Sequence, residues 1–156
     1  MHANERLIDS GRKDPRNFLM PGFRMRGQAR RSEEQTHTMV ARLRELSLAP
    51  PKHIERFHVA FLDSERRVSG MASFGEGSVT ALTMRIRDLF CYALKVEAAA
   101  ILMAHNHPSG DCRPSQKDIE STNRIAQIAK ALDIELLDHL IFSPHGMYSM
   151  RKRGEL

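Results

Sequence analysis

Residues 98–118 read Ala98-Ala-Ala-Ile-Leu-Met-Ala-His-Asn-His-Pro-Ser-Gly-Asp-Cys-Arg-Pro-Ser-Gln-Lys-Asp118, and this stretch decides the fold of the chain. Its first part, residues 98–104, is short and apolar and is followed by turn residues, which predicts a buried strand. Pro108 and Gly110 then turn the chain, and Ser115 is placed to open a helix. The stretch therefore predicts a strand, a loop and a helix in succession.

Two histidines and one carboxylate in this stretch have the spacing of a metal site. His105 and His107 are two residues apart at the end of the expected strand, so their side chains share a face, with Cα atoms about 6.5 Å apart. Asp118 lies in the first turn of the helix and can point back toward the strand end. Two imidazoles and a carboxylate leave the fourth position of a tetrahedral zinc ion open for water. The pattern predicts one catalytic Zn²⁺ on His105, His107 and Asp118.

Other interpretations of the same residues stay open at this point. Ser115 and Asp118 also have the spacing of an ordinary helix cap, with the carboxylate favoured by the helix dipole. The triplet around Asn106 is reminiscent of HNH nucleases, whose defining residues are however scattered over a longer unit. Cys112 lies between the histidines and Asp118, where it is either a fourth ligand or an ordinary loop thiol.

The sequence resembles the RadC-like (JAB) branch of the JAMM/MPN metallopeptidase family. The matching residues are His105-Asn-His-Pro-Ser-Gly110, Pro114-Ser115, Asp118 and Leu137-Asp-His139, within a resemblance that covers residues 53–151. This resemblance implies a JAB/MPN (cytidine-deaminase-like) α/β fold, with a curved mixed sheet flanked by helices. It also implies a zinc-dependent hydrolase that cleaves a peptide or isopeptide bond in a protein or peptide substrate through a zinc-bound water. His105, His107 and Asp118 would be the zinc ligands, and Ser115 would donate a hydrogen bond to the tetrahedral intermediate.

The resemblance further implies a glutamate on an upstream strand that acts as general base. In RadC-like proteins this glutamate precedes the glycine of a Gly-Thr pair by five residues; the pair corresponds here to Gly77-Ser78, and the expected position holds Ala72. Glu76 is the candidate that remains in this stretch. A shift of the strand by an even number of residues could bring Glu76 to the inward face, because the side that a strand residue faces repeats every two residues. The alternative is a solvated loop glutamate. Since a general base contributes about 10²–10⁴-fold to a rate, a chain without one would bind zinc but hydrolyse poorly.

Asp138 and His139 are adjacent on a late expected strand. Histidines that bind a metal usually donate their second ring N–H to a carboxylate or carbonyl, so this pair is predicted to support the ligands, with Asp138 favoured. The alternative is a polar pair that is hydrogen-bonded within the core. His58, on the first expected strand, faces either the same cleft or the interior.

The net charge of +5 is concentrated at the start of the chain. Residues 1–31 hold eight Lys and Arg and three Asp and Glu, whereas residues 32–156 hold sixteen of each sign. We therefore expect a basic N-terminal arm (1–31) before one JAB-type domain (32–156). Its cluster of Arg24, Arg26, Arg30 and Arg31 is either a solvated tail or a nucleic-acid contact. The second functional hypothesis is accordingly a catalytically weak JAB scaffold that binds nucleic acid or a protein partner.

Composition also bounds the cellular location. No run of apolar residues approaches the length of a membrane span, and the first residues lack the apolar core of a signal peptide. The two cysteines, Cys91 and Cys112, do not suggest a disulfide framework. These features predict a reduced, cytoplasmic protein.

The periodicity of the remaining chain predicts the other elements. Helices are expected from residue 32 to the prolines at 50 and 51, from residue 83 or 84, and over residues 115–132. Strands are expected over residues 57–62, 68–74, 134–142 and 147–150. With the strand at 98–104, the order is α-β-β-α-β-α-β-β, which fits a mixed α/β sandwich.

Overall fold

The computed structural model describes residues 29–77 and 85–156, with side chains from residue 33 onward. The elements are α1 (Ala29–Ser47), β1 (Glu55–Leu62), β2 (Val68–Gly77), α2 (Ile86–Lys95), β3 (Ala100–Asn106), α3 (Gln116–Ala131), β4 (Glu135–Ser143) and β5 (Gly146–Ser149). Their order is the one expected from the periodicity. Within the described residues, no helix is long and apolar enough to cross a membrane.

The element boundaries differ from the expected ones in ways that matter for the site. β1 begins at Glu55 rather than at residue 57, so a glutamate becomes the first residue of the sheet. α3 is capped by Ser115, as expected. The expected start of the second helix at residue 83 or 84 lies outside the described residues, and α2 is seen from Ile86.

The five strands form one mixed sheet in the order β2-β1-β3-β4-β5. β3 and β4 are parallel, joined by a crossover through α3, and every other neighbouring pair is antiparallel. β1 and β3 are buried along their whole length, as central strands covered on both faces should be. The predicted fold, a mixed sheet flanked by helices, is confirmed.

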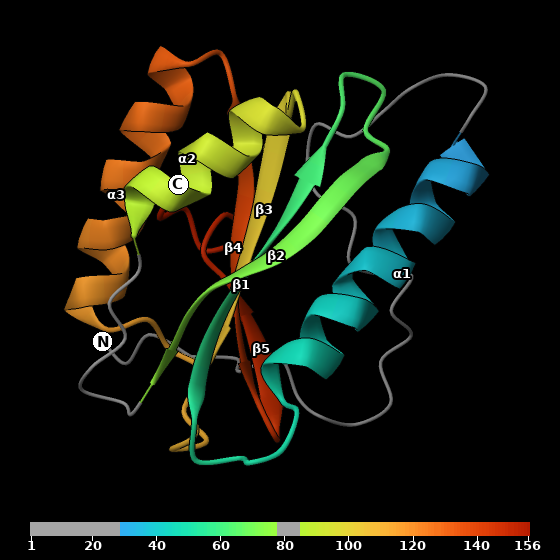
Figure 1. Ribbon diagram of the computed structural model, residues 1–156. Helices are drawn as coiled ribbons and strands as arrows, with labels where there is room; N and C mark the ends of the chain where they lie inside the picture. The colour runs from blue at the N-terminus through green and yellow to red at the C-terminus, as the bar shows by residue number, and fades with distance from the viewer. Residues whose placement is uncertain (1–28, 78–84) are drawn as a thin grey trace, which may run out of the picture.

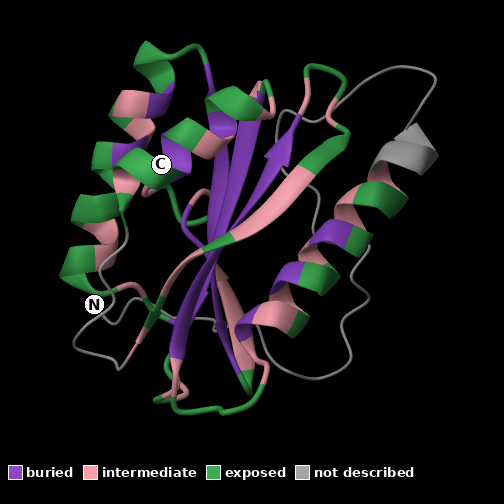
Figure 2. Ribbon diagram, in the orientation of Figure 1, coloured by how far each residue is buried: buried purple, intermediate pink, exposed green. Residues whose placement is uncertain are grey.

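The helices cover opposite faces of the sheet: α1 lies on one face, and α2 and α3 lie on the other (Figure 1). Figure 2 shows the buried residues concentrated in the central strands and on the helix sides that face them. Alternate strand residues belong to the two cores. Phe57, Val59 and Met103 pack with α2 and α3, whereas Ala60 and Leu102 pack with α1. Because successive strand residues point to opposite faces, odd-numbered residues of β1 and β3 enter the core under α2 and α3, and even-numbered residues enter the core under α1.

A β-bulge in β4 changes the facing of the residues that follow it. Ile101 pairs with Leu136 and Leu102 pairs with Asp138, so Leu137 is an extra residue on β4. The guanidinium of Arg151 donates hydrogen bonds to the carbonyls of Leu136, at 2.6 Å, and Leu137. Arg151 thus satisfies two backbone carbonyls in the part of β4 where the bulge interrupts the regular ladder.

Asp138 anchors the C-terminal turn and does not contact the histidines of the metal motif. Its carboxylate accepts hydrogen bonds from the hydroxyl of Ser149, from the backbone N–H of His139 at 2.7 Å and from the backbone N–H of Arg151 at 2.9 Å. The sequence favoured Asp138 over His139 as the support of the ligands. The structure reverses this preference, because consecutive strand residues face opposite sides of a sheet.

Replacement of Asp138 should therefore weaken the fold rather than the site alone. We expect Asp138→Ala to lower the free energy of unfolding by about 3 kcal/mol, because it leaves buried donors from β4, β5 and the last turn without an acceptor. Urea denaturation followed by circular dichroism measures this change. An unchanged free energy of unfolding would show that the three hydrogen bonds do not hold the C-terminal turn.

Candidate metal centre

The sheet topology brings together residues that are far apart in the sequence. β3 ends with His105 and Asn106, and His107 follows. β1 runs antiparallel to β3 and pairs Phe57 with His105; continuing this register by two residues places Glu55 opposite His107. Because Glu55 and Phe57 share a face, Glu55 lies on the side of the sheet covered by α2 and α3.

The three ligands expected from the sequence meet at one point. The Nε2 atoms of His105 and His107 are 2.9 Å apart. Asp118 Oδ1 lies 3.4 Å from His105 Nε2, and Asp118 Oδ2 lies 3.4 Å from His107 Nε2. Ligand atoms bonded to a tetrahedral zinc ion at about 2.0–2.1 Å lie about 3.3 Å from one another. The spacing of these side chains therefore suits one small cation.

The start of α3 holds the Asp118 carboxylate in place. Asp118 and Ser115 form a capping box: Asp118 N–H donates to Ser115 Oγ at 3.2 Å, and Ser115 N–H donates to Asp118 Oδ2 at 2.7 Å. The Ser115 hydroxyl also donates to Oδ2, at 2.6 Å. The capping and ligand interpretations of Asp118 are thus compatible, because the cap fixes a carboxylate that also faces the histidines.

A buried hydrogen-bond chain determines which nitrogen of His105 faces the site. Thr122, one turn after Asp118, donates its only hydroxyl proton to the Asp118 carbonyl at 2.6 Å. The Thr122 oxygen therefore accepts a hydrogen bond from His139 Nδ1, also at 2.6 Å. In a neutral ring, His139 Nε2 then carries a lone pair and accepts from His105 Nδ1 at 2.8 Å. His105 Nε2 consequently presents a lone pair to the site.

His107 is oriented in the same way by its own loop. Its Nδ1 donates to the backbone carbonyl of Asp111 at 2.7 Å, which leaves the lone pair on Nε2. Both imidazoles thus direct a lone pair at the same point, 2.9 Å apart, beside the carboxylate of Asp118. Two lone pairs and an anion at this separation repel one another unless a positive charge lies between them. The donor set therefore fits a metal cation.

The pKa values of these side chains agree with a site that attracts positive charge. Burial raises the pKa of the Asp118 carboxyl, but the contacts that His105 and His107 make with it when they are protonated, together with the hydrogen bond from Ser115, outweigh burial and hold this pKa far below its ordinary range. Burial lowers the pKa of His107, yet its contacts with Asp118, the Asp111 carbonyl and Glu55 outweigh burial, and the net shift is upward. A proton and a metal would compete for His107 Nε2, so metal affinity should fall as the pH is lowered.

Burial lowers the pKa of the His105 ring and of the His139 ring, and it is the largest cause for each. A positive charge on His105 would lower the pKa of His139 further. A neutral His139 is what the hydrogen-bond chain from Thr122 requires. Of the adjacent pair 138 and 139, it is thus His139 that supports the ligands.

Glu55 is the carboxylate at the site that the sequence interpretation did not identify. Its Oε1 lies 3.7 Å from His107 Nε2 and 4.0 Å from His105 Nε2, and the donor atoms of these three residues all lie within 4.8 Å of one another. Desolvation raises the pKa of the Glu55 carboxyl, against an opposing effect of His107. A carboxylate with a raised pKa beside a metal site has the properties of a general base.

Glu76 lies on the opposite face of the sheet from Glu55. It pairs across the strands with Arg56, and the Arg56 Nε–Glu76 Oε1 distance is 2.8 Å. Because Arg56 is adjacent to Glu55 on β1, the two residues face opposite sides. Ala72, where a glutamate was expected, packs into the core instead. The structure therefore brings Glu55, and not Glu76, to the histidines.

The other candidates lie apart from the cluster or outside the described side chains. Cys112 is buried in its loop, and the metal-ligating group found among the described residues does not include it. His58 lies on the α1 side of the sheet, where burial lowers its pKa. Arg24 and Arg26 lie outside the described residues, and Arg30 and Arg31 are in the first turns of α1 with side chains that are not described.

The hydrogen-bond chain to His105 can be tested without touching a ligand. Thr122→Val keeps the size of the side chain but removes the hydroxyl, so His139 Nδ1 loses its acceptor; Thr122→Ser retains it. We expect Thr122→Val to weaken zinc binding about tenfold and Thr122→Ser to leave it nearly unchanged, as measured by competition with a chromophoric chelator. Equal zinc affinity of the two variants would rule out this role of Thr122.

Comparisons with known proteins show the family of the chain. The family model described as RadC-like JAB domain matches residues 30–155. A UPF0758 protein of Symbiobacterium thermophilum is 42% identical over 103 residues, which cover 66% of this chain and 44% of the relative. A UPF0758 protein of Syntrophomonas wolfei is 35% identical over 129 residues, covering 81% of this chain and 55% of the relative. The chain spans about half the length of these relatives. On this evidence, the chain belongs to the RadC-like JAB domain family.

Proposed function

We propose that this protein is a zinc-dependent hydrolase that cleaves a peptide or isopeptide bond. The observation that supports the proposal is the convergence of two imidazole lone pairs and the Asp118 carboxylate, with Glu55 slightly farther away. Three ligands and a separate carboxylate are the parts that hydrolysis by an activated water needs. A purely structural zinc site would instead use four protein ligands.

His105, His107 and Asp118 would hold the zinc ion. When bound, zinc supplies Lewis acidity, which polarises a carbonyl and lowers the pKa of water from 15.7 to about 7. Glu55 would accept a proton from the attacking water and deliver it to the nitrogen that leaves. Its burial, at 6% exposure, raises its pKa and so makes it a better acceptor for this proton.

Ser115 would stabilise the negative charge that develops on the carbonyl oxygen. Its hydroxyl donates to Asp118 Oδ2 in the structure, so rotation about its Cβ–Oγ bond is needed to direct the proton at a substrate. The hydrogen bond from the Ser115 backbone N–H to Asp118 Oδ2 would keep the Asp118 carboxylate in place meanwhile, because it does not depend on the Ser115 hydroxyl.

The assignment of Glu55 is tested by comparing two glutamates on opposite faces of the same sheet. Glu55→Gln should retain stoichiometric zinc and lose about 10²–10⁴-fold in peptide hydrolysis, because the amide cannot accept the proton. Glu76→Gln is the matched control and should keep both properties. Zinc content is measured by elemental analysis and hydrolysis by mass spectrometry of a peptide mixture.

Two results would contradict this assignment. Hydrolysis that survives Glu55→Gln but is lost in Glu76→Gln would restore Glu76 as the base. Stoichiometric zinc together with no hydrolysis by the wild-type protein would remove the enzyme proposal and leave a metal-binding scaffold.

The uneven charge of the chain supports a second function, nucleic-acid binding by the basic arm. All of the net charge of +5 belongs to residues 1–31. We expect replacement of Arg24, Arg26, Arg30 and Arg31 by Gln to reduce the slope of log affinity against log salt by about three to four, if each contacts a phosphate. Fluorescence anisotropy with a duplex DNA measures the slope. Identical slopes for the two proteins would exclude these contacts.

A further inference from the structure

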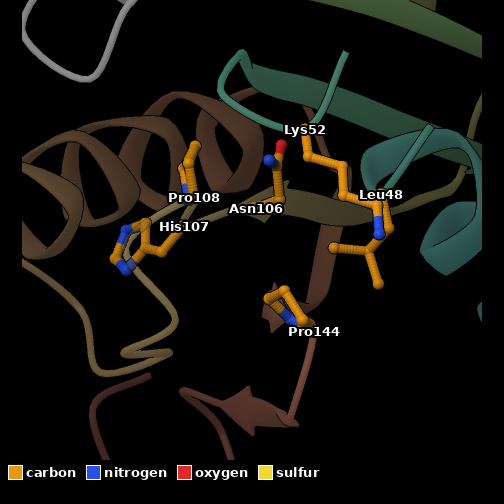
Figure 3. A pocket seen from close by; sticks show the side chains of 6 residues that line it. All are labelled: Leu48, Lys52, Asn106, His107, Pro108 and Pro144. Atoms are coloured by element: carbon orange, nitrogen blue, oxygen red, sulfur yellow. The ribbon is translucent and has the colours of Figure 1, made fainter. Parts of the chain in front are cut away.

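A pocket of about 250 Å³ lies beside His107. It is lined by Leu48, Lys52, Asn106, His107, Pro108 and Pro144. Figure 3 shows these side chains around a common space: Leu48 and Lys52 come from the segment after α1, Pro144 from the turn between β4 and β5, and the others from the end of β3. His107 thus belongs both to the proposed metal site and to the pocket wall.

Asn106 fixes the wall of the pocket through two hydrogen bonds, which leave one Nδ2 hydrogen and one Oδ1 lone pair for a ligand. Its Oδ1 accepts a hydrogen bond from the Arg56 N–H at 2.8 Å, and its Nδ2 donates to the Ile54 carbonyl at 2.9 Å. These bonds tie the segment before β1 to the end of β3. With His107 Nδ1 bonded to Asp111, Lys52 is the charged group that can meet a ligand here.

The charge around the pocket has one sign. The three segments that line it, residues 48–54, 106–110 and 143–147, contain no Asp or Glu, whereas they contain Lys52. Asp111, just beyond the second segment, is paired with Arg113 at 2.7 Å. Glu55 and Asp118 contact His107 Nε2 and are not among the pocket-lining residues. The pocket therefore favours an anion, while the adjacent site favours a cation.

The rest of the lining is apolar. Leu48, Pro108 and Pro144 form walls without hydrogen-bonding side chains. A volume of about 250 Å³ is below the range of about 300–1,000 Å³ of pockets for drug-sized ligands, so it suits a single residue. One residue that offers both an apolar side chain and a negative charge is the apolar C-terminal residue of a peptide.

We propose that this pocket binds the C-terminal residue of a peptide substrate. The apolar side chain lies against Leu48, Pro108 and Pro144, and the α-carboxylate pairs with the Lys52 ammonium. The inference rests on the proposed hydrolase function, because it places the last peptide bond beside His107. Water adds its oxygen to the carbonyl carbon of that bond, the C–N bond breaks, and the amine takes a proton and leaves as a free apolar amino acid.

The test compares substrates that differ only at the terminal carboxylate. The zinc-loaded full chain is given a tetrapeptide ending in leucine, either as the free acid or as the amide, and kcat/KM for loss of the last residue is measured. We expect the free acid to be cleaved at least about fivefold better. Lys52→Glu should abolish or reverse this preference. Lys95 is an exposed lysine that lies just before the opposite end of β3. Lys95→Glu is therefore the matched control and should retain the preference for the free acid.

A binding measurement separates this inference from the hydrolase proposal. N-acetyl-leucine and N-acetyl-leucinamide are titrated into the same three proteins and followed by NMR. If neither peptide is hydrolysed but N-acetyl-leucine binds better than the amide in a Lys52-dependent way, the hydrolase proposal fails and the pocket assignment stands. Either of two results would overturn the assignment to a terminal carboxylate. One is equal hydrolysis of the free acid and the amide. The other is equally good hydrolysis of a peptide amide that carries its negative charge on a glutamate side chain instead of on a terminal carboxylate.

Discussion

Two imidazole lone pairs held 2.9 Å apart are the constraint on which the rest of the site depends. Each is fixed by a hydrogen bond on the far side of its ring, from His105 to His139 and from His107 to the Asp111 carbonyl. This arrangement is unfavourable alone and favourable around a cation. The chain from Thr122 through His139 is almost entirely buried, so water cannot easily replace a missing partner.

The sheet topology explains why this cluster forms at one end of the molecule. β3 delivers the histidines at its carboxyl end, α3 begins nearby after a short loop, and antiparallel β1 begins where β3 ends. The ends of three elements therefore contribute two imidazoles and two carboxylates to one point: the end of β3 supplies the imidazoles, and α3 and β1 supply one carboxylate each. The same loop and the turn after β4 also line the neighbouring pocket. This pocket is apolar and carries the positive charge of Lys52, whereas the metal-ligand cluster beside it contains two carboxylates.

The sequence predicted the fold and the convergence of His105, His107 and Asp118 because both depend on local patterns. His105, His107 and Asp118 lie on one strand-loop-helix unit, so their approach follows from spacing within a short stretch. Glu55 could not be found in this way, because its place opposite His107 depends on the register between β1 and β3. Its local signal is weak: a glutamate two residues before the strand expected over residues 57–62. Likewise, the choice of His139 over Asp138 follows from the facing of β4 after its bulge, which sequence alone does not fix.

The most direct test of this account is the ¹⁵N NMR spectrum of the histidine rings during titration with zinc. We predict that one equivalent of zinc shifts the Nε2 resonances of His105 and His107 together to metal-bound values, while Nδ1 of both rings and of His139 remains protonated. Coordination through Nδ1 of either ring, or saturation without a change at these two Nε2 atoms, would contradict the claim that the fold presets two lone pairs for one metal ion.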